Sequence, residues 1–261
     1  MEQDLYLSVI IPAYKEQDRI GQTLLDIEKF LQTKGYNYEV LVVLDGSPDT
    51  TGAVAKSFSS QITNLRVIEN PENHGKGYVV RQGLLEAKGK FRVFMDADGS
   101  TSIDHVDAFL PEFEKEGYDV VIGSRDIAGA KIDKHQPIYR EWLGNMGNIA
   151  IKSILGLWEY PDTQCGFKML SAQASEEIAS RMVVNRFGFD FELLALAAAL
   201  KFRVKQMPVR WLDEAQGSTV KLFGPNGYLQ VLKDLFATRI RLIFGKYNID
   251  TYTQSHSNQE K

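Results

Sequence analysis

The stretch that decides the fold is FRVFMDADGS, residues 91–100. Its first five residues are mostly apolar and predict a buried strand, and Gly99 predicts a turn soon after it. Asp96 and Asp98 therefore follow the carboxyl end of a strand, where open α/β sheets bind ligands. Carboxylates this close repel each other unless a cation intervenes, and Mg²⁺ or Mn²⁺ favours such oxygen ligands. The pair is a candidate metal site; the alternative is a solvated aspartate turn.

Apolar strands and amphipathic helices alternate around this stretch in the first half of the chain. Strands are expected at residues 7–12, 40–44, 65–68, 91–95 and 120–123, and helices at 20–31, 51–58, 78–87 and 103–113. Such alternation with short connections is typical of a parallel, doubly wound α/β sheet. The sequence contains no internal repeat or linker, so we expect a single folded unit.

The second half of the chain is less regular. A polar, glycine-containing segment at residues 127–137 is a candidate mobile loop. Helices are expected at 142–157, 172–182, 190–200 and 228–244, and strands at 166–170 and 202–209. This half therefore adds strands and helices without the strict alternation of the first half.

The composition narrows the functional classes. The chain has 261 residues, 44% of them hydrophobic, and a formal net charge of -4. These values are ordinary for a globular protein, and the charge argues against general nucleic-acid binding. Cys165 is the only cysteine, so no internal disulfide forms and a reducing compartment is expected. The amino terminus lacks the basic region of a secretory signal, and no apolar stretch is long enough to cross a bilayer.

Polar motifs follow the predicted strands of the first half. They are PAYKE at residues 12–16, DGSPD at 45–49, HGKG at 74–77 and DAD at 96–98. The carboxyl ends of parallel strands meet at one edge of a sheet, so these motifs are expected to gather there. Lys76 lies between two glycines, which allow close approach of the backbone and suit a cation beside a phosphate. The alternative is a solvated surface lysine.

These four motifs and four further motifs downstream, taken in order, resemble those of the family-2 glycosyltransferases, which have the GT-A fold. The downstream motifs are GSR at residues 123–125, DTQCGFK at 162–168, FDFE at 189–192 and PVRW at 208–211. They narrow the resemblance to the polyprenyl-phosphate branch, which includes the dolichyl-phosphate β-glucosyltransferases and mannose synthases. The resemblance spans roughly residues 6–222. It implies an α/β, Rossmann-like three-layer sandwich with a mostly parallel central sheet.

The resemblance also implies an activity. It is that of an inverting, metal-dependent hexosyltransferase that moves a hexose from a UDP-sugar to a polyprenyl (dolichyl or undecaprenyl) phosphate. Ser100 stands where the mannose-transferring relatives often have glutamine, which favours glucose as the sugar. A lipid acceptor implies a peripheral protein at the cytoplasmic face of a membrane. Whether the chain forms a homo-oligomer is open.

Nine residues are implied as the site for the nucleotide sugar. They are Pro12, Ala13, Tyr14, Glu16, Asp45, Lys76, Asp96, Ala97 and Asp98. Asp98 is implied as the principal ligand of Mg²⁺ or Mn²⁺, with Asp96 beside it on the metal or the ribose. The family usually has two consecutive acids at the second strand end, whereas this chain has Leu44 before Asp45. One donor contact is therefore missing, or its register is shifted.

The acceptor phosphate is assigned by the resemblance to three basic residues. They are Arg125, Arg140 and Lys221, and guanidinium suits bidentate phosphate binding. Lys221 is displaced by two positions from the family pattern.

Acids near the reacting centre complete the implied site. In addition to Asp98, Asp162 is the first candidate for an acid near the reacting centre, and Asp190, with Glu192, is the second. Asp190 has an alternative, because an aspartate before an apolar helix also makes a good N-cap.

The carboxyl-terminal part of the chain is expected to differ from the rest. Residues 1–222 are interpreted as the catalytic domain, 223–247 as an amphipathic helix and 248–261 as a disordered tail. The helix combines many apolar residues with Lys233, Arg239, Arg241 and Lys246. Such a helix lies in a membrane interface, on the core or on a second subunit, and amphipathicity alone does not separate these.

Two other functions fit the same motifs. A related transferase acting on a soluble saccharide or protein hydroxyl would need a true base, and Asp162 or Asp190 would then be essential. A non-catalytic nucleotide-sugar-binding module is the other, with Leu44 as the mark of a degenerate site.

Overall fold

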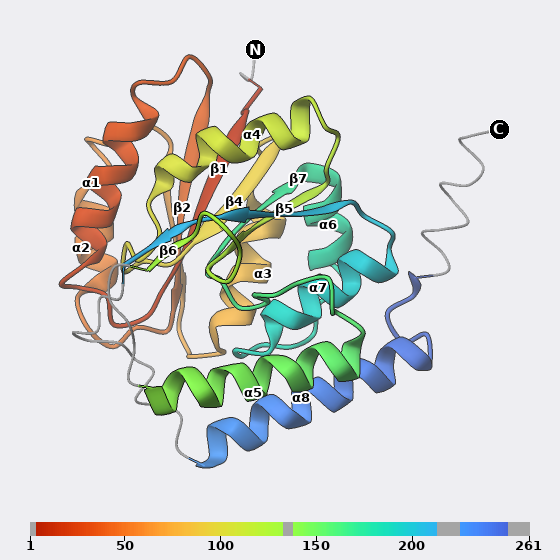
Figure 1. Cartoon of the computed structure of the whole chain (residues 1–261). Helices are drawn as coiled ribbons and strands as arrows, with labels where there is room; N and C mark the ends of the chain where they lie inside the picture. Colours follow the sequence, from red (N-terminus) through yellow and green to blue (C-terminus); the bar gives the residue numbers. More distant parts are fainter. Residues whose placement is uncertain (1–3, 133–137, 213–224, 250–261) are drawn as a thin grey trace.

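The structure, a computed structural model, describes residues 4–132, 138–212 and 225–249. Its centre is a seven-stranded sheet with the strand order β3-β2-β1-β4-β7-β5-β8 (Figure 1). The strands are β1 (Leu7–Ala13), β2 (Tyr38–Asp45), β3 (Leu65–Asn70), β4 (Phe91–Met95), β5 (Val120–Ser124), β7 (Phe167–Ser171) and β8 (Val204–Pro208). Neighbouring strands are parallel except that β7 runs antiparallel to β4 and β5. The predicted mostly parallel sheet is confirmed.

Helices cover both faces of the sheet and complete the three layers. The cover on one face is α1 (Ile20–Leu31), α2 (Thr51–Ser57) and α4 (Val106–Glu114), and on the other α3 (Lys76–Glu86), α6 (Ala172–Ala179) and α7 (Phe189–Ala199). Successive side chains of a strand point to opposite faces, so Ile10 joins the core under α3 and α7, and Ile11 the core under α1 and α4. Strands buried on both faces need continuous apolar runs, which is why the sequence indicates them clearly.

Element ends shift by up to four residues from the sequence predictions, and three of the differences have a structural explanation. Helix α3 begins at Lys76 rather than at residue 78, because Gly75 has a positive φ of 108° and ends the loop there. The segment expected as a helix at 103–113 begins with a turn of 3₁₀ helix, Ile103–His105. The predicted loop at 127–137 contains β6 (Lys131–Ile132), which pairs with β9 (Arg210–Trp211). Strands of two residues are too short to leave a periodic signal.

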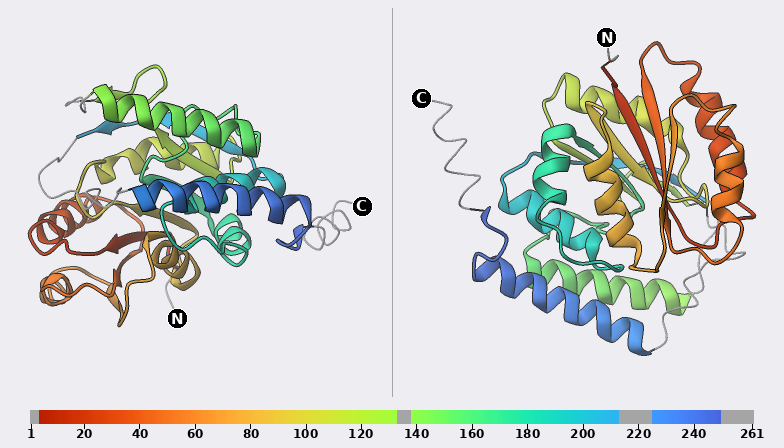
Figure 2. Two further views of the ribbon diagram at one scale, coloured as in Figure 1. Left: turned by 90° about the horizontal axis from the view of Figure 1, so that it is seen from below. Right: turned by 180° about the vertical axis from the view of Figure 1, so that it is seen from behind.

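Helices α5 (Ile138–Leu155) and α8 (Pro225–Ile243) lie side by side at the lower end of the molecule in Figure 1, and the views in Figure 2 agree. Helix α8 also packs against α7. Leu235 is buried in this contact, and the Tyr247 hydroxyl donates a hydrogen bond of 2.7 Å to Glu192 Oε1. One face of the carboxyl-terminal helix is therefore part of the core.

The expected division into domains stays a prediction. The boundary at residue 222 and nearly all of the tail at 248–261 lie outside the described residues. Among the helices that the structure describes, none combines the length and the apolar character that a membrane span requires.

Candidate active site

A cavity of about 250 Å³ lies at the carboxyl ends of β1, β2 and β4. The loops that follow parallel strands converge at this edge, as the fold class predicts. The lining includes all nine residues predicted for the nucleotide sugar: Pro12, Ala13, Tyr14, Glu16, Asp45, Lys76, Asp96, Ala97 and Asp98. It also includes six residues that the sequence did not indicate: Arg19, Asn73, Gly75, Val79, Arg186 and Phe187. The predicted donor residues are therefore brought together in one place, while their roles stay predictions.

The two carboxylates after β4 have different surroundings. Asp96 Oδ1 lies 2.5 Å from the Lys76 ammonium, and Asp98 Oδ1 accepts a hydrogen bond of 2.9 Å from the backbone N–H of Ser100. Burial disfavours the charged ammonium, but Asp96 and Asp190 outweigh it and raise the pKa of Lys76. Lys76 therefore remains a cation at neutral pH and is fixed at the cavity wall.

The cavity fits a divalent cation that arrives with a phosphate substrate. Its lining carries four carboxylates and three basic side chains, so with all groups ionised the formal charge is negative. A diphosphate would be repelled unless a cation accompanied it. In the described part of the chain, no group of three or more His, Cys, Asp or Glu side chains is arranged to hold a metal. Mg²⁺ commonly binds one or two carboxylates plus substrate phosphates, which is what Asp96 and Asp98 offer.

Asp45 lines the cavity, but its carboxylate already has partners. It accepts hydrogen bonds from the backbone N–H groups of His74, at 2.7 Å, and Gly75, and from the Asn73 side chain at 2.8 Å. The loop that carries Lys76 is thereby tied to the end of β2. Asp45 thus has a positioning role, which the turn-like sequence around it did not reveal.

The segment between α6 and α7 forms another wall of the cavity. A side chain at Gly75 or Gly77 would collide with backbone there, because an added Cβ would lie 2.5 Å from Asn185 O or 2.4 Å from Val184 O. These two glycines let the Lys76 loop pack directly against residues 184–186, which brings Arg186 into the lining. The FDFE motif just downstream is the sequence signal that pointed to this region.

Glu16 and Arg19 form a paired unit at the start of α1. Arg19 donates from Nε to Glu16 Oε2 and from Nη2 to Glu16 Oε1, both at 2.7 Å. Burial raises the pKa of Glu16 to about 7, against the opposing effect of Arg19 and with added repulsion from Asp98 and Asp96. The spacing of three residues between an acid and an arginine was the available signal for Arg19.

Asp190 belongs to a buried ion pair rather than to a helix cap. Helix α7 has Gly188 at its N-cap, so the N-cap interpretation of Asp190 is wrong. The Asp190 carboxylate pairs with Lys168, whose side chain is 0% exposed and also donates to Cys165 O at 2.7 Å. Burial raises the pKa of Asp190, and Lys168 and Lys76 oppose that rise. An alternating series of charges thus links Lys168 through Asp190 and Lys76 to Asp96.

Glu192 is held inside the protein. Its carboxylate accepts hydrogen bonds from the backbone N–H groups of Val183 and Val184 and from the Tyr247 hydroxyl. It therefore fixes the segment between α6 and α7 and the end of the chain beyond α8, and it does not line the cavity.

Asp162 holds Arg125 in a two-point ion pair. Arg125 donates from Nε at 2.7 Å and from Nη2 at 3.0 Å, and the backbone N–H groups of Arg125 and Gln164 donate to the same carboxylate. Burial would raise the pKa of Asp162, but the hydrogen bonds and charge of Arg125 outweigh it and lower the pKa. A carboxylate with a lowered pKa is a weak base, so its geometry suits orientation of Arg125.

The other acceptor residues are not placed with Arg125. Arg140 lies near the start of α5, where side chains fall outside the described part, and Lys221 lies outside the described residues altogether. Arg125 itself packs over the Trp211 ring, with 5.4 Å between its guanidinium carbon and the ring centroid. The predicted grouping of the three basic residues stays a prediction.

The fold and the cavity define a class of protein, the GT-A glycosyltransferases. The solved structures that share the fold include glucosyl-3-phosphoglycerate synthase of Mycobacterium tuberculosis in complex with Mn²⁺, UDP-glucose and phosphoglyceric acid. It has a TM-score of 0.65 and 18% identity, over 90% of this chain and 80% of that one. TarS of S. aureus in complex with UDP-GlcNAc has a TM-score of 0.60 and 17% identity, over 90% and 66% of the two chains.

The sequence defines the family within that class. The family model described as glycosyl transferase family 2 matches residues 8–179, and the chain belongs to this family. The dolichyl-phosphate β-glucosyltransferase of Drosophila melanogaster is 36% identical, over 94% of this chain and 78% of the relative. The enzymes of the same name from Dictyostelium discoideum and Homo sapiens are 32% and 30% identical, over 94% of this chain and 77% and 78% of the relatives. The resemblance seen in the motifs is confirmed.

Proposed function

We propose that the protein transfers a hexose, with glucose favoured, from a UDP-sugar to a polyprenyl phosphate. The observation that carries this proposal is the cavity at the sheet edge, where Asp96, Asp98 and Lys76 converge. Support for the acceptor and the sugar comes from the relatives, which are named dolichyl-phosphate β-glucosyltransferases and match 94% of the chain. Support for the nucleotide comes from the structures of the same fold, which hold UDP-glucose or UDP-GlcNAc.

The proposed reaction is a single in-line displacement. An oxygen of the acceptor phosphate attacks the anomeric carbon, the bond from that carbon to the UDP oxygen breaks on the opposite face, and the configuration inverts. A phosphate monoester is already anionic near neutral pH, so it needs positioning more than deprotonation. Mg²⁺ or Mn²⁺ held by Asp98 and Asp96 would neutralise charge on the diphosphate. Lys76 adds a fixed positive charge beside the leaving group.

The state of the two candidate bases favours a phosphate acceptor over a hydroxyl acceptor. Asp162 is engaged with Arg125 and Asp190 with Lys168, so both carboxylates are already ion-paired. A hydroxyl nucleophile needs a base to take its proton, whereas a phosphate oxygen does not. Asp162 instead orients Arg125, whose guanidinium suits an acceptor phosphate.

An exposed apolar stripe on α8 supports a lipid acceptor and a peripheral location. Helix α8 exposes a row of large apolar side chains on the side that does not pack on the core: Leu229, Leu232, Phe236, Ile240, Ile243 and Phe244. Their spacing of three and four residues puts them along one stripe. Lys233, Arg239 and Lys246 add exposed positive charge. We extend the proposal to binding of this stripe at the cytoplasmic face of a membrane.

A donor and acceptor screen tests the proposal. Purified protein with Mg²⁺ or Mn²⁺ is offered UDP-glucose, UDP-GlcNAc or GDP-mannose together with a short polyprenyl phosphate, and product is detected by mass spectrometry. We expect a glucosyl lipid phosphate and stoichiometric release of UDP. Transfer only to soluble saccharides would favour a hydroxyl acceptor, and UDP binding in calorimetry without turnover would favour a binding module.

A further inference from the structure

Arg19 lines the cavity, and one of its three guanidinium nitrogens lacks a hydrogen-bond partner in the described part of the chain. Two of its guanidinium nitrogens, Nε and Nη2, are held by Glu16. The third, Nη1, is buried and has no hydrogen-bond partner among the residues that the structure describes. A buried charged N–H group without an acceptor is costly, so such a group calls for a ligand that supplies one.

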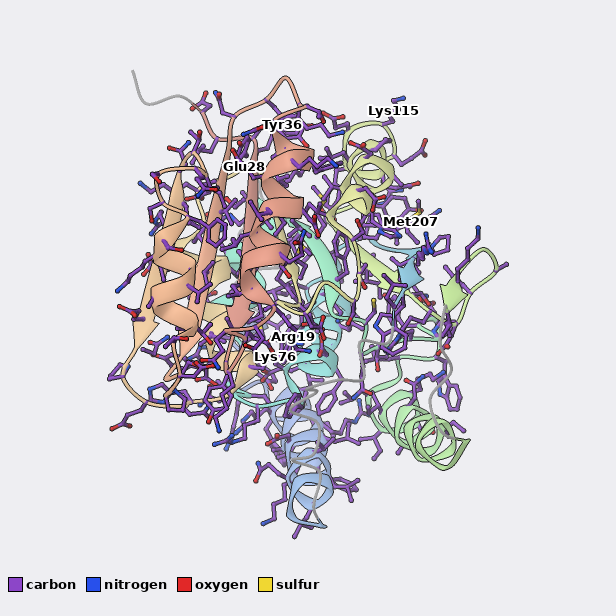
Figure 3. All side chains as sticks on the ribbon, turned by 90° about the vertical axis from the view of Figure 1, so that its left-hand side faces the viewer. Arg19, Glu28, Tyr36, Lys76, Lys115 and Met207 are labelled. Carbon is purple, nitrogen blue, oxygen red and sulfur yellow. The ribbon has the colours of Figure 1, made fainter. Side chains whose placement is uncertain are left out.

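The position of Arg19 is fixed relative to the carboxylates after β4. Thr23, one turn along α1, donates from its side chain to Ala97 O at 2.7 Å and from its backbone N–H to Arg19 O at 3.2 Å. The start of α1 is therefore tied to the turn that carries Asp98. Lys76 lines the same cavity from α3, and Figure 3 labels both basic residues at this end of the sheet.

We propose that the Arg19 guanidinium donates a hydrogen bond to a phosphate oxygen of the nucleotide-sugar donor, an inference that rests on the proposed function. Glu16 is then a positioning residue, because Arg19 occupies both of its carboxylate oxygens. The guanidinium suits phosphate, and its fixed plane leaves only one edge for a ligand. Lys76 and Arg19 would both bind the diphosphate, and Asp98 in the same cavity lining would be able to share a divalent cation with it.

Calorimetry on the full chain with Mn²⁺ tests this contact. The probes are UDP and uridine, and the variants are Arg19→Met and Arg19→Lys. The matched control is Arg181→Met, because Arg181 also pairs with a glutamate one turn before it in the chain, Glu177, but does not line the cavity. We expect both Arg19 variants to bind UDP roughly ten- to a hundred-fold more weakly, the range for a hydrogen bond to a charged group. Uridine affinity and the control should stay at wild-type values.

A double variant distinguishes direct contact with the ligand from the positioning of Arg19 by Glu16. Glu16→Gln should weaken UDP binding in the wild-type background but not in the Arg19→Met background, because the carboxylate acts through the guanidinium. Wild-type UDP affinity in both Arg19 variants would overturn the inference, as would an equal loss for UDP and uridine. Arg19→Lys keeps the charge and serves as the test should the methionine variant fold poorly. Failure of the wild-type chain to bind UDP at all would instead overturn the proposed function, and the inference with it.

Discussion

The motifs from the first half of the chain, which line the cavity, and those from the second half, around Arg125 and Lys168, use their charged side chains differently. On the donor side, Lys76 and Arg19 line an open cavity together with Asp96 and Asp98, and ligand atoms can reach them. On the other side, the acids of the downstream motifs are already saturated by Arg125 and Lys168. Among the described residues, Asp162 and Asp190 each hold a basic side chain, as Asp96 holds Lys76, whereas Asp98 accepts only from the backbone N–H of Ser100. This difference is why we propose that Asp98 shares a cation with the substrate.

The largest effect should come from the carboxylate that is least engaged by the protein. Asp98→Ala is expected to reduce transfer by roughly a hundred- to a thousand-fold, because the diphosphate would lose its cation ligand. Asp104→Ala, in an exposed position on the same loop, is the control. Transfer rates and circular dichroism are measured together. Near-normal turnover by the folded Asp98 variant would contradict a role for Asp98 as a cation ligand, and with it the proposed difference between the two sets of motifs.

The next effect tests the fixed cation of the donor side. Lys76→Met should lower kcat/KM for the UDP-sugar roughly ten- to a hundred-fold and leave the KM for the acceptor unchanged. Lys56→Met is the control, since Lys56 pairs with Glu69 on the exposed surface. A change in the acceptor KM with unaltered donor kinetics would contradict the assignment of Lys76 to the UDP-sugar donor.

Asp162→Asn probes the second half. It leaves the half-buried Arg125 without its counterion, so we expect about 2 kcal/mol of lost stability and about a tenfold rise in acceptor KM. The pKa of Asp162 is lowered in the folded state, so its stabilisation is present above the unfolded pKa of about 4 and is lost as pH falls through the folded pKa. Urea unfolding between pH 2 and 7 should show less acid dependence for the variant. The control is Asp107→Asn at an exposed pair.

The smallest expected effect concerns the apolar stripe of α8. The double variant Phe236→Ser and Phe244→Ser should bind liposomes with anionic lipids about tenfold more weakly, because two exposed aromatic side chains no longer enter the interface. Activity on a short, soluble polyprenyl phosphate should not change. Leu25→Ser with Leu85→Ser, two exposed apolar positions on α1 and α3, is the control. Equal liposome binding by all three proteins would contradict the interfacial role. Deleting the whole helix is a poorer test, since Leu235 belongs to the core.

Much of the fold and of the donor site could be predicted because both depend on local patterns. Buried parallel strands need continuous apolar runs, and the residues directly after them must reach the same edge. The partners of Asp45, Asp162 and Asp190 could not be predicted in this way. Each carboxylate is recognisable in the sequence, but its partner lies in another segment of the chain, as Lys168 of β7 does for Asp190 and the backbone of residues 74–75 does for Asp45.

The direction of β7 was also hidden from the sequence. An apolar run of five residues looks the same whether its neighbours run with it or against it. Arg19 was missed for a different reason: it belongs to no motif, and its spacing of three residues from Glu16 does not by itself indicate a residue that lines a cavity.

Because β7 is antiparallel to its neighbours, the loop that enters β7 and the loops that leave the parallel strands lie at the same edge of the sheet. A strand that runs against its neighbours starts where they stop, so Phe167 pairs with Met95 at the last position of β4. The residues that enter β7 therefore meet those that leave β4, and a Cβ added at Gly166 would lie 2.2 Å from Asp96 Oδ2. Because position 166 has no side chain, the segment that enters β7 can lie against the segment that leaves β4. Even alanine at this position would displace the Asp96 carboxylate. The place of the Asp96 carboxylate in the cavity lining is set, in part, by a residue with no side chain.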